Sequence, residues 1–263
     1  MDLGLHGKVA LVAAASKGLG RAIAEELATE GADIVMCARG EEALSRARDE
    51  IATATGANVL AVAGDVAKSD DVDRITQAAI DRFGRVDILV TNAGGPPSAK
   101  FESVTDEMWR KAIELTLMSA INLTSRVLPG MKQRKWGRVI NVTSITVKQP
   151  VDGLMLSNSL RAAVTGFART LANEVALDGI TVNNILPGYT RTERVEQLAS
   201  SRASREGITS DAARAEWEQQ IPMRRLGEPR EFAALAAFLA SERASYITGT
   251  SITVDGGWTR GLL

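Results

Sequence analysis

The sequence predicts an α/β fold: a Rossmann-like, doubly wound parallel sheet of seven strands with helices on both faces. Short β-branched runs alternate with amphipathic helical segments along the chain, and most of these runs are apolar at both alternating positions. Strands that are apolar on both sides are typical of a parallel sheet covered by helices on each face. Short joints between alternating elements imply right-handed crossovers, so a ligand crevice is expected beyond the carboxyl ends of the strands.

The elements follow one another in a regular order. The predicted strands span residues 9–15, 32–38, 59–66, 86–91, 138–143, 181–186 and 251–254. Apolar residues three and four apart predict helices over residues 20–30, 41–55, 70–83, 106–131, 157–177 and 229–240. Four of the predicted joints have a glycine suited to a left-handed cap, namely Gly31, Gly56, Gly84 and Gly179, and Pro229 suits a first helical turn.

One stretch, residues 191–221, breaks this rhythm. It is polar, rich in Ser, Arg, Glu and Ala, and has a helical pattern near residues 210–220. Because it follows the sixth strand, where a substrate would bind, we interpret it as a substrate lid. We therefore expect one domain over residues 1–263 with this lid as an insertion.

Composition limits the classes of partner. The formal net charge is −1 and charges of both signs are spread along the chain, which argues against nucleic acid and against an anionic membrane surface. A single cysteine, Cys37, excludes an internal disulfide, and with His6 as the one histidine no metal site is expected. The chain has no uninterrupted run of 18 apolar residues and no signal-like start, so we expect a cytoplasmic protein.

The turn after the first predicted strand carries the first functional signal. Residues 13–20 read Ala-Ala-Ala-Ser-Lys-Gly-Leu-Gly and lead into a helix, where backbone N–H groups can approach a pyrophosphate. This turn resembles the Thr-Gly-x-x-x-Gly-x-Gly turn of short-chain dehydrogenases/reductases, with Ala13 for Thr and Ala14 for the first Gly. A methyl group at Ala14 replaces the bare α-carbon that a tight turn prefers, so weaker dinucleotide binding is expected. The alternative is a purely structural turn.

Further markers of the same family follow in its order along nearly the whole chain. They are Asp65-Val66 after the third strand, Asn92-Ala93-Gly94 after the fourth and Pro187-Gly188 after the sixth. The resemblance implies that these residues border the adenine, the ribose and the nicotinamide. The complete set of expected cofactor-binding residues is Ala14, Ser16, Lys17, Gly18, Leu19, Gly20, Arg39, Asp65, Val66, Asn92, Ala93, Gly94, Arg161, Pro187, Gly188, Thr190 and Thr192.

The residue after the second strand indicates which dinucleotide binds. Ala38 stands where a carboxylate would accept from a ribose 2′-OH, Arg39 follows it, and Lys17 lies in the phosphate turn. Two cations in place of a carboxylate favour NADP(H), with NAD(H) left as an open alternative. Both charges could instead be ordinary solvated side chains.

The catalytic residues of the family are mostly replaced. The resemblance places Ser144 at the family's serine, Ser157 at its tyrosine, Arg161 at its lysine and Thr116 at its asparagine. Ser157 and Arg161 are one helical turn apart and can address one ligand, but a serine is a far weaker acid than a phenol, and an arginine stays protonated. Tyr189, beside the expected nicotinamide, is either a substitute proton donor or a packing residue.

Three functions remain open at this stage. The first is an NADP(H)-dependent reductase of a small carbonyl substrate, resembling 3-oxoacyl-carrier-protein reductases. The second is a catalytically weak or inactive dinucleotide-binding protein that acts as a sensor or hetero-oligomer partner, and the third is elimination or isomerisation on the same scaffold. The resemblance also implies a homo-oligomer, a dimer through residues 106–131 and 157–177 or a tetramer that also uses residues 255–258.

Overall fold

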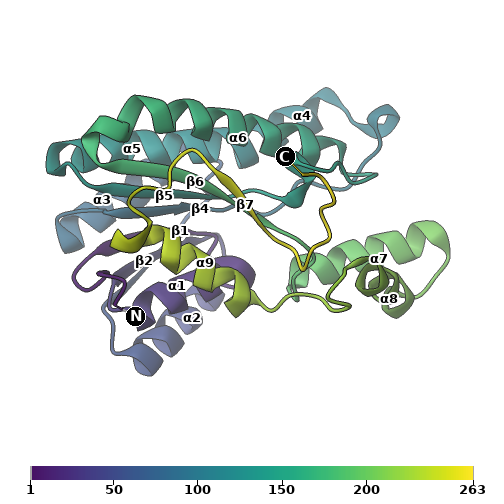
Figure 1. The fold of residues 1–263 in the computed structure, drawn as a ribbon, viewed down its shortest axis with the longest axis horizontal. Helices are drawn as coiled ribbons and strands as arrows, with labels where there is room; N and C mark the ends of the chain where they lie inside the picture. Colours follow the sequence, from purple (N-terminus) through teal and green to yellow (C-terminus); the bar gives the residue numbers. More distant parts are fainter. Residues whose placement is uncertain (1, 263) are drawn as a thin grey trace.

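The computed structural model describes residues 2–262 and contains one parallel sheet in the strand order β3-β2-β1-β4-β5-β6-β7 (Figure 1). Every neighbouring pair of strands is parallel. The strands are β1 (Val9–Ala13), β2 (Asp33–Ala38), β3 (Val59–Ala63), β4 (Ile88–Thr91), β5 (Gly137–Val142), β6 (Ile180–Pro187) and β7 (Ser251–Val254). The predicted fold class is confirmed, and the strand order reverses between β1 and β4, where such sheets form a crevice.

Helices cover both faces of the sheet (Figure 1). One face carries α1 (Gly18–Thr29), α2 (Glu41–Thr55) and α9 (Pro229–Ala240), and the other carries α3 (Ser69–Phe83), α5 (Ser119–Arg134) and α6 (Met155–Val175). Successive residues of β1 alternate between these layers: Ala10 and Val12 pack toward α1 and α9, whereas Val9 and Leu11 pack toward α3, α5 and α6. This alternation explains why the strand is apolar at every position.

The helical stretch predicted over residues 106–131 is interrupted. It comprises α4 (Asp106–Ala112), a π-helical turn η2 (Ile113–Met118) and α5. Within this stretch the Ser119 hydroxyl donates to the Leu115 carbonyl oxygen at 2.6 Å. Such wide turns occur often at functional sites, and this one contains Thr116.

Two helices, α7 (Glu193–Glu206) and α8 (Ser210–Gln220), extend from the carboxyl end of the sheet (Figure 1). The sequence pattern predicted the second of them. It missed α7 because only Val195, Ala199 and Ala203 on that helix are buried, four residues apart, within an otherwise polar segment. The Thr192 side chain caps α7 by accepting from the Val195 N–H.

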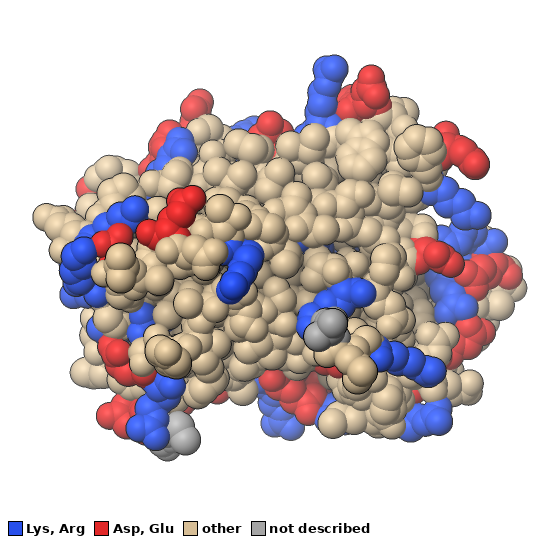
Figure 2. Space-filling view, turned by 45° about the horizontal axis from the view of Figure 1, so that its top comes forward, with Lys and Arg blue, Asp and Glu red and all other residues tan. Residues whose placement is uncertain are grey.

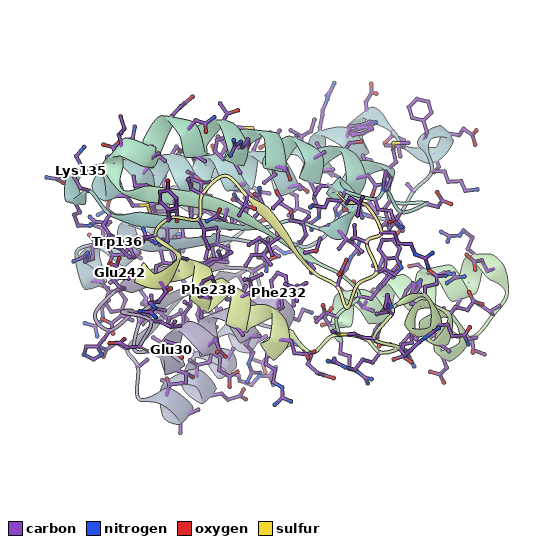
Figure 3. The ribbon with its side chains drawn as sticks, viewed as in Figure 1. Glu30, Lys135, Trp136, Phe232, Phe238 and Glu242 are labelled. Carbon is purple, nitrogen blue, oxygen red and sulfur yellow. The ribbon has the colours of Figure 1, made fainter. Side chains whose placement is uncertain are left out.

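Short 3₁₀ turns complete the chain between residues 2 and 262: η1 (Phe101–Ser103), η3 (Ile145–Val147), η4 (Ala176–Asp178) and η5 (Glu242–Ala244). At the amino-terminal edge of the sheet, opposite α7 and α8, Trp136 and Glu242 lie together (Figure 3), with the indole N–H donating to the carboxylate at 2.6 Å. Acidic and basic side chains are intermixed on the face shown in Figure 2. None of the described helices is both long and apolar enough to span a bilayer.

Candidate active site

The candidate site lies where the carboxyl ends of β1, β4, β5 and β6 meet. Parallel pairing brings the segments that follow these four strands to one edge of the sheet. The β1–α1 turn, the loop after β4, η3 and the start of α7 therefore lie at the edge of the sheet where a ligand crevice is expected. Most of the residues expected from the sequence belong to these segments.

The β1–α1 turn is unusually tight. Ala14 has a positive φ of 51°, and Gly18 has a φ of 59°. A Cβ on Gly20 would lie 2.4 Å from the Ala14 carbonyl oxygen, so α1 approaches the turn as closely as a glycine allows. Ala14 thus adopts the left-handed backbone that favours glycine, which costs an L-residue roughly 1–2 kcal/mol. Ser16 and Leu19 lie partly buried in the same turn.

The first turn of α7 and the residue before it touch this glycine-rich turn. Lys17 forms an ion pair with Glu193, and the Thr192 methyl carbon would lie 3.5 Å from a Cβ on Gly18. Arg39, after β2, is exposed and forms no ion pair or hydrogen bond with residues 2–262. Of the two predicted cations at the adenosine end, Lys17 is therefore already paired and Arg39 is not.

The remaining expected cofactor residues border the crevice in different ways. Asp65 accepts from the Ala67 N–H at 3.1 Å and Val66 is buried, whereas Asn92, Ala93 and Gly94 form a loop open to solvent in part. After β6, the Gly188 N–H donates to the Val254 carbonyl oxygen at 2.9 Å, and a Cβ there would lie 2.6 Å from the Asp255 Cβ.

The segment that follows β6 is tied to the chain beyond the lid. Pro187 pairs with Val254 in the sheet, and the buried Thr190 forms a bridge with Gly227. These contacts give Pro187, Gly188 and Thr190 a structural role whatever they bind.

The structure brings Ser157 and Arg161 together beside the end of β5. The Arg161 Nε donates to the Ser157 Oγ at 3.3 Å, and the Arg161 Nη1 donates to the carbonyl oxygens of Val142 at 2.9 Å and Thr143 at 2.7 Å. The guanidinium thus ties α6 to the end of β5, next to Ser144. The Ser144 Oγ accepts from the Thr146 N–H at 3.2 Å.

Both serine hydroxyls therefore act as acceptors toward the protein. Neither hydroxyl donates a hydrogen bond to any residue from 2 to 262. A hydroxyl has one proton to donate, so the proton of each serine remains available to a further acceptor.

A second arginine, Arg194 on α7, lies close to this cluster. Its Nη2 donates to the Pro96 carbonyl oxygen at 2.9 Å, which links α7 to the loop after β4. Burial, and then the charge of Arg194, lower the pKa of Arg161 to about 10, and burial lowers the pKa of Arg194 as well. The sequence analysis missed Arg194, because within a polar segment it resembles an ordinary solvated charge.

Thr116 and Tyr189 have different surroundings. Thr116 is buried in the π-helical turn, which packs against α6, and its hydroxyl has no hydrogen-bond partner among the described residues. The Tyr189 ring stacks on Trp217 with centroids 4.4 Å apart and meets Trp258 edge-on at 5.8 Å. Burial raises the pKa of Tyr189 to about 12, so its hydroxyl is a weaker acid than that of a free tyrosine.

A cavity of about 350 Å³ adjoins Tyr189, between the loop that precedes α6 and the lid helices. Val151, Leu154, Leu198 and Trp217 give it apolar walls, and Arg202 and Arg205 stand among its polar groups. Because α6 begins one residue after Leu154, the cavity opens near the start of the helix that carries Ser157.

Fold and site together define a doubly wound α/β protein with a serine–arginine cluster at the carboxyl ends of its strands. Residues 13–259 match the family model described as enoyl-(acyl carrier protein) reductase. The chain belongs to the short-chain dehydrogenase/reductase family, a family of oxidoreductases, and the predicted family is confirmed.

The chain is similar to several characterised members over almost its full length. It is 37% identical over 255 residues to 3-oxoacyl-[acyl-carrier-protein] reductase of Vibrio cholerae (97% of this chain, 98% of that protein). It is 38% identical over 262 residues to D-beta-hydroxybutyrate dehydrogenase of Cupriavidus necator (97% of this chain, 98% of that protein). L-sorbose reductase of Gluconobacter frateurii, solved with NADPH and L-sorbose, superposes with a TM-score of 0.94 at 37% identity, covering 100% of both chains.

Proposed function

We propose that the chain is an NADP(H)-dependent carbonyl reductase from an atypical subgroup of the family, similar to 3-oxoacyl-carrier-protein reductases but with Ser157-x-x-x-Arg161 in place of Tyr-x-x-x-Lys. The observation that supports this most directly is the hydrogen bond from the Arg161 Nε to the Ser157 Oγ. It occupies a lone pair of the serine and leaves the hydroxyl proton free for a carbonyl oxygen.

When bound, the dinucleotide would supply the hydride that reduces the carbonyl carbon. The Ser144 and Ser157 hydroxyls donate hydrogen bonds to the carbonyl oxygen, and the neighbouring Arg161 charge stabilises the negative charge that develops there. The reduced oxygen takes its proton from Ser157. Because a serine is a poor acid and an arginine stays protonated, a water molecule must return a proton to Ser157, and the resulting hydroxide passes to solvent. Thr116, with its unpartnered buried hydroxyl, and Tyr189, beside the lid, complete the proposed catalytic set.

The choice of NADP(H) rests on the end of β2 and on similar proteins. Ala38 provides no carboxylate for a ribose 2′-OH and Arg39 has no acidic partner among residues 2–262, while L-sorbose reductase and actinorhodin polyketide ketoreductase were solved with NADPH. The backbone of residues 14–20 would hold the pyrophosphate, with Asp65 to Val66 and Asn92 to Gly94 beside the nucleoside. Replacing Arg39→Glu should weaken NADPH far more than NADH in a binding titration, and equal losses would contradict this assignment.

The same proposal treats residues 1–263 as one domain in which residues 191–221 form the lid. The ion pair between Lys17 and Glu193 and the hydrogen bond from Arg194 to Pro96 support a lid role, because they connect the first turn of α7 to both walls of the crevice. We further propose a cytoplasmic homo-oligomer, a dimer or a tetramer, that acts on small carbonyl compounds and binds neither nucleic acid nor membranes.

The decisive experiment follows NADPH oxidation over a panel of ketones and oxoacyl thioesters. Ser157→Ala should lower kcat at least about 100-fold because the donor to the carbonyl oxygen is lost. Ser159→Ala is the matched control, since Ser159 is exposed on the same helix and its hydroxyl only donates to the Met155 carbonyl oxygen. Absence of turnover over the whole panel, with NADPH binding intact, would contradict the reductase.

That negative result would favour the second candidate, an inactive dinucleotide-binding sensor or hetero-oligomer partner. The observation in its favour is the replacement of three family residues by Ser157, Arg161 and Thr116. Activity that appears only in the double variant Ser157→Tyr/Arg161→Lys would support this candidate. Activity of the unmodified chain that the double variant does not increase would exclude it.

A further inference from the structure

Two partly buried guanidinium groups at the crevice have no acidic partner among the residues that the structure describes. Arg161 lies on α6 and Arg194 on the first turn of α7, and neither forms an ion pair with any carboxylate of residues 2–262. Charges removed from water are normally paired, because an isolated charge is costly to bury. Arg202 on α7 follows that rule, because its largely buried side chain pairs with Glu206 and Glu216.

The hydrogen bonds leave a set of unused donors on these two groups. An arginine carries five N–H donors. Arg161 uses Nε and Nη1 on Ser157, Val142 and Thr143, so both N–H groups of its Nη2 have no partner among the described residues. Arg194 uses one N–H of Nη2 on Pro96 and leaves the others without a partner in the same part of the chain. Paired N–H groups in a plane match the two oxygens of a carboxylate.

The backbone around Arg194 is shaped to hold its guanidinium. A Cβ on Gly95 would lie 2.7 Å from the Arg194 Nη2 and 3.0 Å from its Cζ, so the group rests directly on the glycine α-carbon. Any side chain at residue 95 would displace it. The missing side chain at Gly95 and the acceptor at Pro96 together fix the cation against the wall of the crevice.

The two cations also act on each other. Arg194 is held on the loop after β4 and Arg161 on the end of the adjacent strand β5, and the charge of Arg194 contributes to the lowered pKa of Arg161, so the two like charges repel each other. An anion bound by both would offset this repulsion. The group would lie beside Ser157 rather than at the glycine-rich turn, because Arg161 is hydrogen-bonded to Ser157.

We propose that Arg161 and Arg194 jointly bind a carboxylate of the carbonyl substrate, which makes the substrate an oxo acid. This inference rests on the proposed reductase function and specifies its substrate class. Because Arg194 lies on the first turn of α7, a carboxylate bound by both arginines would also link α7 to α6.

The test is calorimetric titration of the protein loaded with NADP⁺, which has no hydride to transfer, with 2-oxobutanoate and acetoacetate, each compared with its uncharged methyl ester. We expect at least one free acid to bind at least about tenfold more tightly than its ester, as two charge-assisted contacts imply. Arg194→Leu should remove that preference while leaving the Kd of NADPH within about twofold. Arg225→Leu is the control, since Arg225 lies outside the crevice and is paired with Glu231.

Four other outcomes have distinct meanings. The inference would be overturned if the unmodified protein preferred neither acid to its ester. It would also be overturned if Arg194→Leu lost acid affinity and NADPH affinity equally, because the arginines would then bind a cofactor phosphate. If Arg194→Leu fails to fold, Arg194→Lys can replace it, because lysine keeps the charge but lacks the paired N–H groups of the guanidinium. An acid affinity of Arg194→Lys equal to that of the unmodified protein would contradict the inference. Acid binding without turnover would refute the reductase and leave the carboxylate site standing.

Discussion

The two edges of the sheet treat buried charge in opposite ways. At the amino-terminal edge the fully buried Asp87 accepts from the Val9 N–H at 3.0 Å, from Arg85 at 2.6 Å, and lies 3.4 Å from the Arg134 Nε. At the carboxyl-terminal edge Arg161 and Arg194 have only neutral partners among residues 2–262.

The difference separates charges that are paired within the fold from charges that, on our proposal, bind a ligand. A fully buried carboxylate surrounded by cations and N–H donors finds all its partners within the protein. Removing it leaves those partners buried without an acceptor, which lowers the free energy of unfolding. A cation that the protein leaves without an acid adds little to the fold and retains its attraction for an anion. Variants at the amino-terminal edge should therefore mainly lower stability, whereas variants of the two arginines at the carboxyl-terminal edge should mainly weaken binding.

The largest effect on stability is expected from Asp87→Ala. This change leaves the Val9 N–H and two arginines without their shared acceptor, and breaking a buried ion pair from one side costs about 3–5 kcal/mol. Urea denaturation followed by circular dichroism measures the loss in the free energy of unfolding. Asp49→Ala serves as the control because Asp49 pairs with Arg48 at the surface. Equal free energies for both variants would contradict the distinction.

A smaller loss is expected from Gly20→Ala at the carboxyl-terminal edge. The new methyl group would lie 2.4 Å from the Ala14 carbonyl oxygen, and such overpacking typically costs about 1–3 kcal/mol. The turn must open to relieve the contact, so the affinity for NADPH should fall as well. Gly166→Ala is the matched helical control, since nothing lies within 4 Å of its added Cβ. A Gly20→Ala protein with unchanged stability and cofactor affinity would refute the tight turn.

Most of the fold could be predicted from the sequence because its signals are local. Strands buried on both faces read as continuous apolar runs, and Gly31, Gly56, Gly84 and Gly179 all adopt the positive φ that their cap positions require. The π-helical turn and α7 were missed for local reasons too. A π turn leaves no clear periodicity over six residues, and α7 buries too few side chains to show an apolar face.

The site was predictable only as far as the family pattern reaches. That pattern pointed to Ser144, Ser157 and Arg161. The hydrogen bonds from Arg161 to Val142 and Thr143 join residues that are 19 and 18 positions apart in the sequence, so they depend on how α6 packs against β5. Arg194 carried no signal at all, because an unpaired arginine differs from a solvated one only once the surrounding chain has folded.

Arg194→Leu should sharpen the comparison by its small effect on stability. The side chain contributes one hydrogen bond to Pro96 and no ion pair among the described residues, so the free energy of unfolding should change by less than about 1 kcal/mol. Urea denaturation of this variant beside Asp87→Ala compares the two edges directly. A loss as large as that of Asp87→Ala would make Arg194 a structural residue and remove the contrast between the edges.

The smallest expected effect concerns Tyr189, which tests whether burial at the lid is strong enough to keep a phenol neutral. In the Tyr246→Phe protein Tyr189 is the sole tyrosine, so the phenolate absorbance reports on it alone. Because its folded pKa is raised from 10.0 to about 12, its contribution to stability is fully present below pH 10 and is lost as the pH rises toward 12.

The folded protein should therefore form phenolate only near pH 12, whereas the same chain in denaturant should titrate near pH 10. This order follows from the stacking on Trp217 and the contact with Trp258, which exclude the water that would stabilise a phenolate. A phenolate that forms below pH 8 in the folded protein would show that Tyr189 can exchange its proton at working pH. It would then replace Ser157 as the expected donor to the carbonyl oxygen, and the serine–arginine pair would serve binding alone.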